Sequence, residues 1–350
     1  MTCILGIESS CDETAAAILC SDKQILAQAI ASQEDSHAPF GGIVPELAAR
    51  AHVDRLAPMI DQVCKQAAVD LKDLDAIAAT AGPGLIGGVI VGLVTGKALA
   101  LALDRPLIAV NHLEAHALSP RLVTTVDFPY LLMLASGGHC QILKVEGVGC
   151  YRRLGTTIDD AVGEAFDKTA KILKLGFPGG AIVEARARLG DPGSFQFPRP
   201  LIGTAEPNFS FSGLKTAVLR EVQKGVDDRD IPDICAAFQA AIVDCLVDRV
   251  HVALNILKSE AEEKVKALVC AGGVASNQEI RAALETCADN HGLPFVAPPA
   301  WLCTDNAAMV AWAGIERYSH GLTDELTIAA RARWPLDEDA LPVRGAGVKA

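Results

Sequence analysis

No Cys-x-x-Cys pair occurs among the 11 cysteines of this sequence, which are scattered singly from Cys3 to Cys303. Because their number is odd and their spacing is irregular, the pattern argues against a disulfide framework. We expect free, mostly buried thiols, as in proteins of a reducing cytoplasm.

A basic leader is also absent, since residues 3–7 enter an apolar strand directly. Residues 76–96 form an uncharged run with the composition of a membrane span. Pro83 and six glycines interrupt this run, so we interpret it as a buried strand, a turn and a helix. The sequence therefore predicts a cytoplasmic protein with no membrane contact.

Positive charge is scarce: 31 lysines and arginines are outnumbered by 43 aspartates and glutamates, which gives a net charge of −12. An acidic surface repels nucleic acid at long range, so contact with nucleic acid requires a local basic patch or a partner protein. Lys168, Lys171 and Lys174 recur every three residues and are the best candidates for phosphate contacts, although most such strips are merely solvated.

Strands and helices alternate along the 350 residues, which predicts the α/β class and leaves room for two domains or one duplicated fold. Residues 4–19 and 130–145 each comprise a strand, a small polar turn and a second strand, over 16 residues in both cases. This similarity predicts an internal duplication. We expect two lobes around a cleft: residues 1–129, and residues 130–334 with a helical insertion, followed by a polar tail at 335–350.

The expected strands are residues 4–10, 15–19, 25–31, 76–80, 107–110, 130–135, 140–145, 266–271 and 294–297. The expected helices are residues 45–67, 159–175, 213–222, 233–257, 277–288 and 305–318, with further helices that end near 103, begin at 112 and end at 189.

His112 and His116 open the helix that follows the apolar strand 107–110. Two imidazoles four residues apart lie on one helix face and can bind one metal ion. Taken alone, such a pair is more often two partly exposed histidines at a strand–helix junction. A catalytic metal site also needs a third ligand, for which Asp305 is a candidate. Thr304 and Asp305 are also ordinary helix N-cap residues, and from the residues alone the cap is the better interpretation.

Two glycine turns and several carboxylates are further candidates. The turn 136–138 is explained as a tight hairpin. The turn 272–277 is explained by a capping box of Ser276 and Glu279, although free N–H groups at a helix start can also bind phosphate. Neither turn has the Rossmann or Walker A pattern, so the evidence for a nucleotide-binding site is unspecific.

Glu8, Asp12 and Glu13 lie in and beside the first polar turn, and Asp167 lies further along the chain. Carboxylates beside a cleft serve as bases or metal ligands. Asp167 has a simpler alternative, a surface ion pair with Lys171 one helical turn later.

Together these stretches resemble the universal tRNA threonylcarbamoyladenosine transferase family, whose bacterial and mitochondrial members were once called glycoproteases or sialoglycoprotein endopeptidases. The matches run in order over nearly the whole chain, and their combination is far more specific than any one of them. The matching blocks are residues 4–14, 41–52, 81–88, 111–116, 136–139, 163–168, 211–215, 271–277 and 304–309.

The resemblance implies the duplicated actin-like, sugar-kinase-like (ASKHA) fold. It also implies one divalent metal ion, held by His112, His116 and Asp305; nitrogen and oxygen ligands suit Zn or Fe, and Mg is also compatible. Asp12 and Glu13 resemble the family's acidic pair near the reaction centre, so we expect a catalytic or positioning role for them. The resemblance places the adenylate substrate at Leu134, Ala135, Ser136, Gly137, Gly138, Asp167, Gly180 and Asn277, and at Glu184, where only some members use an acidic ligand.

The implied reaction transfers a threonylcarbamoyl group from threonylcarbamoyl-AMP to the exocyclic amine of an adenosine. That adenosine lies next to the anticodon of tRNAs that read codons beginning with adenine. Bacterial relatives work with a paralogous ASKHA subunit and a small P-loop ATPase, whereas mitochondrial relatives can act without them. We expect the bacterial arrangement, because no mitochondrial leader is evident.

Three other functions remain open at this point. A metallopeptidase of the zincin type needs Glu directly after the first His, whereas Leu113 stands there and Glu114 comes one residue later. A small-molecule kinase of the same fold would transfer phosphate from ATP to a hydroxylated acceptor. A nucleotide-binding scaffold would carry out no chemistry.

Overall fold

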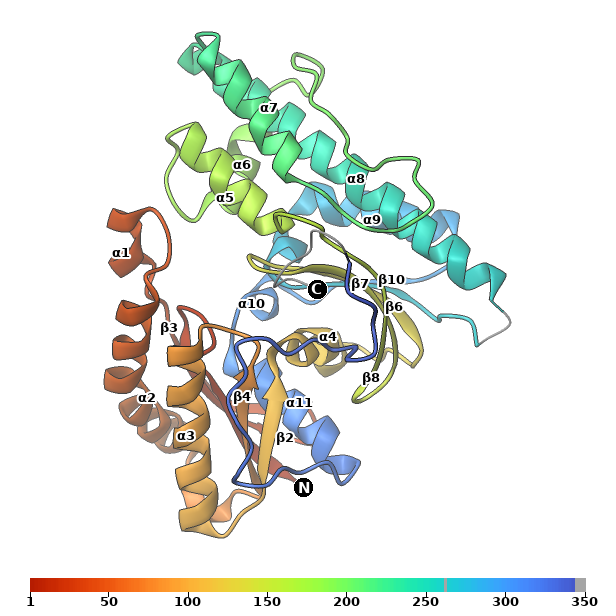
Figure 1. Ribbon diagram of the computed structural model, residues 1–350. Coiled ribbons are helices and arrows are strands. Elements are labelled where there is room, and N and C mark those ends of the chain that lie inside the picture. The colour runs from red at the N-terminus through yellow and green to blue at the C-terminus, as the bar shows by residue number, and fades with distance from the viewer. Residues whose placement is uncertain (261–262, 344–350) are drawn as a thin grey trace. The chain divides into compact units, whose positions relative to one another are not determined.

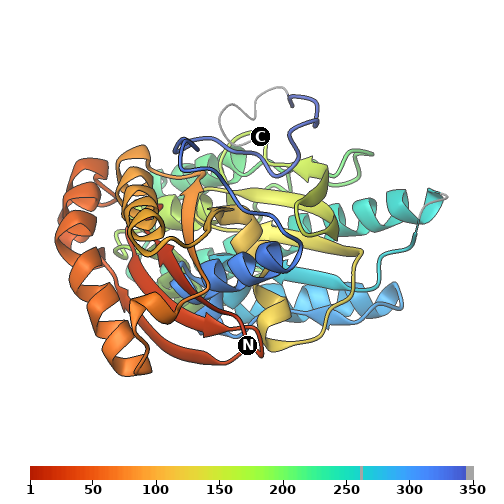
Figure 2. The ribbon, with the colours of Figure 1, turned by 90° about the horizontal axis from the view of Figure 1, so that it is seen from below.

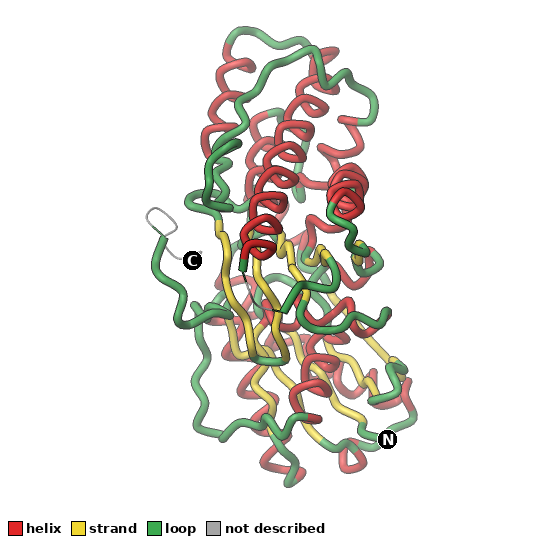
Figure 3. The backbone as a smooth tube through the Cα atoms, turned by 90° about the vertical axis from the view of Figure 1, so that its right-hand side faces the viewer, coloured by secondary structure: helices red, strands yellow, loops and turns green. Residues whose placement is uncertain are grey.

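The computed structural model describes residues 1–260 and 263–343, along which helices and strands alternate (Figure 3). The contacts within the chain define two compact units. Unit 1 comprises Met1–Thr125, Val148–Cys150 and Thr304–Glu338, and unit 2 comprises Val126–Gly147, Tyr151–Cys303 and the residues from Asp339 onward. Residues 304–334, which the sequence analysis grouped with the second lobe, thus pack within unit 1.

Unit 1 is built on a five-stranded sheet with the order β3-β2-β1-β4-β5, in which β1 is antiparallel to β2 and parallel to β4. Its strands are β1 (Cys3–Glu8), β2 (Thr14–Cys20), β3 (Ile25–Ala31), β4 (Ala76–Gly82) and β5 (Leu107–Asn111). Its helices are α1 (Glu34–His37), α2 (Pro45–Ala67), α3 (Ile86–Leu103), α4 (His112–Val123) and α11 (Ala307–Ser319), with 3₁₀ turns at Ala38–Phe40 and Leu71–Asp73.

Helices cover both faces of this first sheet. Leu5 and Ile7 of β1 belong to a core that also includes residues of α2 and α3, which lie side by side (Figure 2). Side chains alternate between the two faces of a strand, so Gly6 faces the other side, where α11 packs on the sheet. Because both faces are covered, the strands are almost entirely apolar rather than alternating.

Unit 2 repeats this plan with the sheet order β10-β9-β6-β7-β8. Its strands are β6 (Tyr130–Ala135), β7 (Cys140–Gly147), β8 (Cys150–Thr156), β9 (Leu268–Ala271) and β10 (Phe295–Val296). Its helices are α5 (Val162–Ile172), α6 (Gly179–Ala187), α7 (Ser212–Gln223), α8 (Ile231–Ser259), α9 (Gln278–Asn290) and α10 (Ala300–Cys303), with 3₁₀ turns at Asp228–Asp230 and Gly273–Ser276. Helices α5 to α9 share one hydrophobic core with β6 and β7 (Figure 1).

The two sheets have the same topology, which confirms the predicted duplication. Read from its other end, the second sheet has the order β8-β7-β6-β9-β10, which corresponds strand by strand to β3-β2-β1-β4-β5. As in unit 1, the central strand β6 is antiparallel to the strand that follows it and parallel to β9, which in turn is parallel to β10.

Helix α3 is the one described helix that is long and apolar enough to cross a membrane, with a mean hydropathy of 2.0. In the structure it packs on β4 and on α2. Its buried residues include Val89, Leu93 and Ala100. The strand, turn and helix predicted for residues 76–103 are thus present as β4, the turn at Pro83 and α3.

Most predicted elements are confirmed, and β3, α2 and β6 have the predicted bounds. Strand β8, which contains Arg152 and Arg153, was not predicted. Strand β8 is the outermost strand of its sheet. There Arg152 pairs with Glu260 at 2.9 Å and Arg153 donates to the carbonyl of Leu341 at 2.5 Å. The short helices α1 and α10 were also missed.

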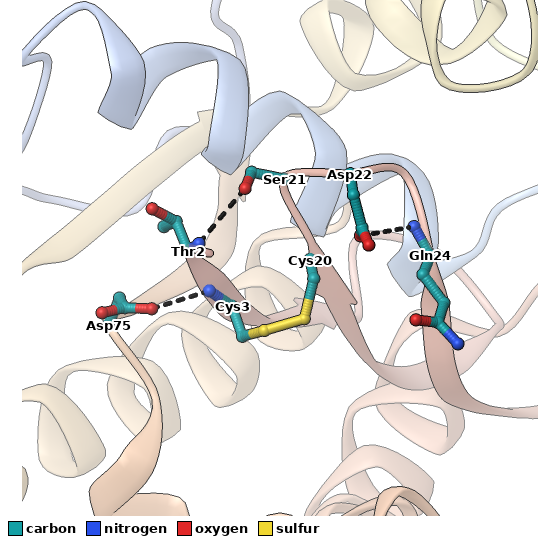
Figure 4. The surroundings of a disulfide bond; sticks show 7 residues. All are labelled: Thr2, Cys3, Cys20, Ser21, Asp22, Gln24 and Asp75. Atoms are coloured by element: carbon teal, nitrogen blue, oxygen red, sulfur yellow. Dashed lines mark hydrogen bonds between the residues drawn. A yellow bond between two sulfur atoms is a disulfide. The ribbon is translucent and has the colours of Figure 1, made fainter.

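One disulfide corrects the expectation that all thiols are free. Cys3 and Cys20 face each other on the antiparallel strands β1 and β2, with their Cα atoms 4.1 Å apart, and their sulfur atoms are bonded (Figure 4). The spacing rule that argued against disulfides cannot detect such a pair, because hairpin register brings together residues that are 17 positions apart. The other nine cysteines are free, and six of them are buried, as expected.

Candidate functional site

His112 and His116 occupy the first turns of α4. The buried strand β5 ends at Asn111, whose side-chain oxygen accepts a hydrogen bond from Leu113 N at 2.9 Å and so caps the helix. This cap starts the helix at His112, so that both imidazoles lie on one face with ring centroids 4.7 Å apart. His112 is 8 % exposed and His116 is fully buried, so the simpler interpretation of partly exposed histidines is wrong.

Asp305 completes a group of three potential ligands in unit 1. Its Oδ1 lies 3.2 Å from His116 Nε2 and 3.4 Å from His112 Nε2. One ligand atom from each of the three residues lies within 4.8 Å of the others. The structure therefore brings together the three predicted metal ligands, although Asp305 is 189 positions from His116 in the sequence.

Asp305 is not the cap of α11. Asn306 has that role, because its Oδ1 accepts a hydrogen bond from Met309 N at 2.9 Å. The N-cap interpretation of Thr304 and Asp305 was therefore wrong by one residue. Since the neighbouring Asn306 caps the helix, the carboxylate of Asp305 is available to face the two histidines.

The charges of Asp305 and His112 shift each other's pKa values. Burial alone would raise the pKa of Asp305, but His112 and His116 hold it well below its usual value. Burial alone would lower the pKa of His112, but Asp305 and Glu8 raise it well above its usual value. Two imidazole nitrogens and a carboxylate oxygen at these distances fit a divalent metal of intermediate softness. Binding of such a metal displaces the protons that otherwise lie between these three side chains.

Asp12 and Glu13 lie in the β1–β2 turn, and Glu13 is close enough to Asp305 to interact with its charge. Burial, followed by the charges of Asp305 and Asp12, raises the pKa of Glu13 to about 10. Glu13 is therefore a neutral acid at pH 7 in the metal-free chain, whereas Asp12 is only 8 % exposed and lies beside it. The structure thus places Glu13 within reach of the Asp305 charge, with Asp12 beside Glu13.

The predicted adenylate residues all belong to unit 2, where several loops converge. Leu134 and Ala135 end β6, and the following turn is closed by a bond from His139 N to Ser136 Oγ at 3.1 Å. A Cβ on Gly163 would lie 2.6 Å from the carbonyl of Ser136, and one on Gly272 would lie 2.4 Å from that of Ala135. The start of α5 and the 272–277 turn therefore both approach the end of β6, beside Gly137 and Gly138.

Asp167, Gly180 and Glu184 lie on α5 and α6. Asp167 accepts a hydrogen bond from Gly179 N at 2.7 Å and so supports the start of α6, which replaces the surface pair with Lys171 that we considered. A Cβ on Gly180 would meet no atom of the described residues within 4 Å, so the backbone is open there. Glu184 accepts a bond from Gln278 N at 3.1 Å, which links α6 to α9.

Asn277 caps α9 through a bond from Ile280 N to its Oδ1 at 3.1 Å. The proposed capping box of Ser276 and Glu279 is therefore wrong: Ser276 Oγ instead donates to the carbonyl of Gly273. The amide of Asn277 also donates to Gln239 Oε1 at 2.8 Å. Nothing in the sequence pattern of α8 pointed to Gln239.

Comparison with known proteins decides the family. The model of one family, described as TsaD: tRNA N6-adenosine threonylcarbamoyltransferase, matches residues 24–312. A protein of that name from Sphingopyxis alaskensis is 64 % identical, with both chains covered completely. Another from Brucella suis is 56 % identical over 98 % of each chain. The chain belongs to the TsaD family.

The fold of this TsaD family member is also found in distant proteins. The chain superposes on HypF of T. kodakarensis with a TM-score of 0.59 at 15 % identity, over 92 % of this chain and 48 % of that one. On component A of (R)-2-hydroxyglutaryl-CoA dehydratase from Acidaminococcus fermentans the TM-score is 0.53 at 17 % identity, over 91 % and 100 %. These likenesses support the ASKHA-type fold and carry no statement about activity.

Proposed function

We propose that the chain transfers a threonylcarbamoyl group from threonylcarbamoyl-AMP to the exocyclic amine of the adenosine next to the anticodon. The tRNAs are those that read codons beginning with adenine. The observation that carries this proposal is the full-length likeness to proteins named for this reaction, in a chain whose His112, His116 and Asp305 converge within 4.8 Å.

In this proposal His112, His116 and Asp305 hold one divalent metal ion, Zn or Fe, with Mg also compatible. A metal held there would supply Lewis acidity toward the threonylcarbamoyl group. The three side chains would contribute two neutral nitrogen ligands and one charged oxygen ligand; both histidines are buried, and the Asp305 side chain is 21 % exposed.

Asp12 and Glu13 act on the incoming amine. The lone pair of an adenine amine is delocalised into the ring, so the amine attacks weakly and the acyl donor must be activated. We assign Asp12 to accept the proton that the amine loses as the new C–N bond forms. We assign Glu13 to orient Asp12 through the hydrogen bond between their side chains. AMP departs with the electron pair of the broken C–O bond and needs no strong acid.

The convergent loops of unit 2 hold the adenylate. The N–H groups of Gly137 and Gly138 bind the phosphate, as backbone donors do in other anion sites. The open backbone at Gly180 admits the adenosine, beside Asp167, Glu184 and Asn277. The remaining residues of this proposed pocket are Leu134 and Ala135, at the end of β6.

The proposed partners are tRNA, threonylcarbamoyl-AMP, a paralogous ASKHA subunit and a small P-loop ATPase. The proposed location is the cytoplasm, without membrane contact.

A metallopeptidase fits the site less well. The carboxylate of Glu114 would have to face the metal-bound water, as in zincins. It instead accepts bonds from Gly149 N at 2.9 Å and from Arg317 at 3.0 Å, and Glu114 is only 1 % exposed. The Glu114 carboxylate therefore forms an ion pair with Arg317 and does not face the histidines as a zincin glutamate would.

The proposal is tested by mixing the purified chain with threonylcarbamoyl-AMP and unmodified tRNA, with and without the two helper subunits. The His112→Ala variant is compared with wild type and with His251→Ala, a control in an exposed histidine pair of unit 2. We expect the modified nucleoside from wild type and the control. We expect His112→Ala to lose more than the roughly 10–100-fold that removal of an outer partner costs. Equal product from His112→Ala would contradict the proposed role of the metal site.

A further inference from the structure

We propose that Glu8 is a positioning residue, which holds the His112 ring so that its Nε2 faces His116 and Asp305. The inference rests on the proposed metal centre, since it concerns how one ligand of that centre is oriented. Glu8 is the last residue of β1 and is fully buried. Its Oε2 lies 2.9 Å from His112 Nδ1, on the opposite side of the ring from Asp305.

The carboxylate of Glu8 is itself fixed by two further donors. Ser10 N donates to its Oε1 at 2.6 Å, and Thr80 Oγ1 donates to its Oε2 at 2.8 Å. An ionised carboxylate only accepts hydrogen bonds, so the remaining contact requires a proton on His112 Nδ1. That proton leaves Nε2 as the ligating nitrogen.

The position of Glu8 follows from the sheet. Strands β1, β4 and β5 are neighbouring parallel strands, so their carboxyl ends meet at one edge. Glu8 ends β1, Thr80 lies near the end of β4, and His112 follows β5 directly. The three residues are therefore brought together by strand register, although 104 positions separate Glu8 from His112.

The second histidine has no equivalent support. His116 Nδ1 is buried and makes no hydrogen bond with any residue in the described part of the chain. The hydroxyl of Ser10 also lies 3.2 Å from His112 Nδ1, but it is farther away than Glu8 and carries no charge. Metal-binding histidines commonly pass their other N–H to a carboxylate, which fixes the ring and raises its basicity. Of the two histidines, only His112 has such a carboxylate at its Nδ1 within the described residues, and it is that of Glu8.

The test compares Glu8→Gln with Glu114→Gln. Glu114 is a matched control, because it is a buried glutamate on the same helix as both histidines but pairs with Arg317. For each metal-free protein, the dissociation constants of Zn²⁺ and Co²⁺ are measured by competition with a chromophoric chelator, and the visible spectrum of the Co²⁺ form is recorded. Thermal unfolding of the metal-free proteins shows whether each variant is folded.

We expect Glu8→Gln to weaken metal binding about 10–100-fold and to change the Co²⁺ spectrum, with the Glu114→Gln values close to those of wild type. A folded Glu8→Gln protein with the affinity and spectrum of wild type would overturn the inference while the metal centre stands. Wild-type protein that binds neither ion would overturn the metal centre and this inference together.

A second measurement needs no Glu8 variant. In Zn²⁺-loaded wild type labelled with ¹⁵N-histidine, we expect His112 to show a protonated Nδ1 and a metal-bound Nε2, with the signal assigned by its loss in His112→Gln. A signal with Nδ1 bound to the metal, or without a proton on Nδ1, would refute the inference even if Glu8→Gln fails to fold.

Discussion

His52 shows how a single neutral side chain supports the turn that carries Asp12 and Glu13. It is fully buried on α2. Its Nε2 donates to the carbonyl of Cys11 at 3.1 Å, and its Nδ1 accepts from Thr14 Oγ1 at 2.8 Å. One ring therefore holds both ends of the turn, and only the neutral form can donate on one side and accept on the other.

Burial lowers the pKa of His52 below its usual value of 6.5. The folded chain thus binds this proton less readily than the unfolded chain, so the stability that His52 provides is present above pH 6.5 and is lost as the pH falls below it. We expect His52→Gln to cost about 1–3 kcal/mol at pH 7.5 through its lost hydrogen bonds. Between pH 7.5 and 5.5 it should then lose less stability than wild type does.

Urea unfolding at the two pH values measures both effects. The exposed His320, replaced by Gln, serves as the control and should retain the wild-type dependence on pH. An identical pH dependence in wild type and His52→Gln would show that His52 does not carry this charge-linked stability.

At the scale of elements, the docking of α11 on the first sheet depends on Gly6. A Cβ at this position would lie 2.4 Å from the carbonyl oxygen of Ala307 and 2.6 Å from the amide nitrogen of Ala311, both backbone atoms of α11. Gly314 makes the reciprocal approach to Ala78. Since Asp305 immediately precedes α11, the depth at which this helix sits also sets the position of the carboxylate.

We expect Gly6→Ala to destabilise the chain by about 1–3 kcal/mol, because the added methyl group overlaps a backbone that cannot rotate away. It should also weaken Zn²⁺ binding, since Asp305 moves with α11. Gly213→Ala in α7 is the control: Gly213 is exposed, no atom in the described part of the chain lies within 4 Å of its Cβ position, and the change should stabilise by about 0.5–1 kcal/mol. Urea unfolding and Zn²⁺ titration of both variants test this prediction. Equal stability and equal Zn²⁺ affinity in the two variants would refute the role of Gly6.

At the scale of the whole molecule, a net charge of −12 must be reconciled with a tRNA substrate. The predicted strip of three lysines is only partly available. Lys168 pairs with Asp160 at 2.8 Å and with Glu164 at 2.7 Å, so it is neutralised within unit 2. Lys171 and Lys174 are exposed, and within residues 1–260 and 263–343 they form no ion pair.

We therefore expect the double variant Lys171→Glu/Lys174→Glu to weaken tRNA binding and to lower the slope of log K against log salt by about 1–2. The control, Lys65→Glu/Lys72→Glu, makes the same change of net charge at exposed lysines of unit 1 that already pair with Asp61 and Asp70. Titrations of both double variants with tRNA at several salt concentrations compare their affinities and salt slopes. Equal weakening by both variants would indicate a general charge effect instead of a local contact.

The sequence alone determined what depends on local spacing. The apolar segments and the proline and turn residues at their ends specified β3, α2 and β6 to the residue, and the four-residue spacing of His112 and His116 specified a shared helix face. These features follow from the periodicity of the backbone, because it fixes which nearby residues lie on the same face of a helix or strand. The repeat of strand, turn and strand revealed the duplication for the same reason.

Only the tertiary structure decided which distant groups meet. It assigned the α11 cap to Asn306 and so left Asp305 to face the histidines, paired Cys3 with Cys20, and placed Glu8 and Thr80 behind His112. Each of these outcomes depends on strand register or helix docking between segments far apart in the chain. Hydrogen-bonding side chains such as Asp305 satisfy several local roles equally well, and the packing around them selects one.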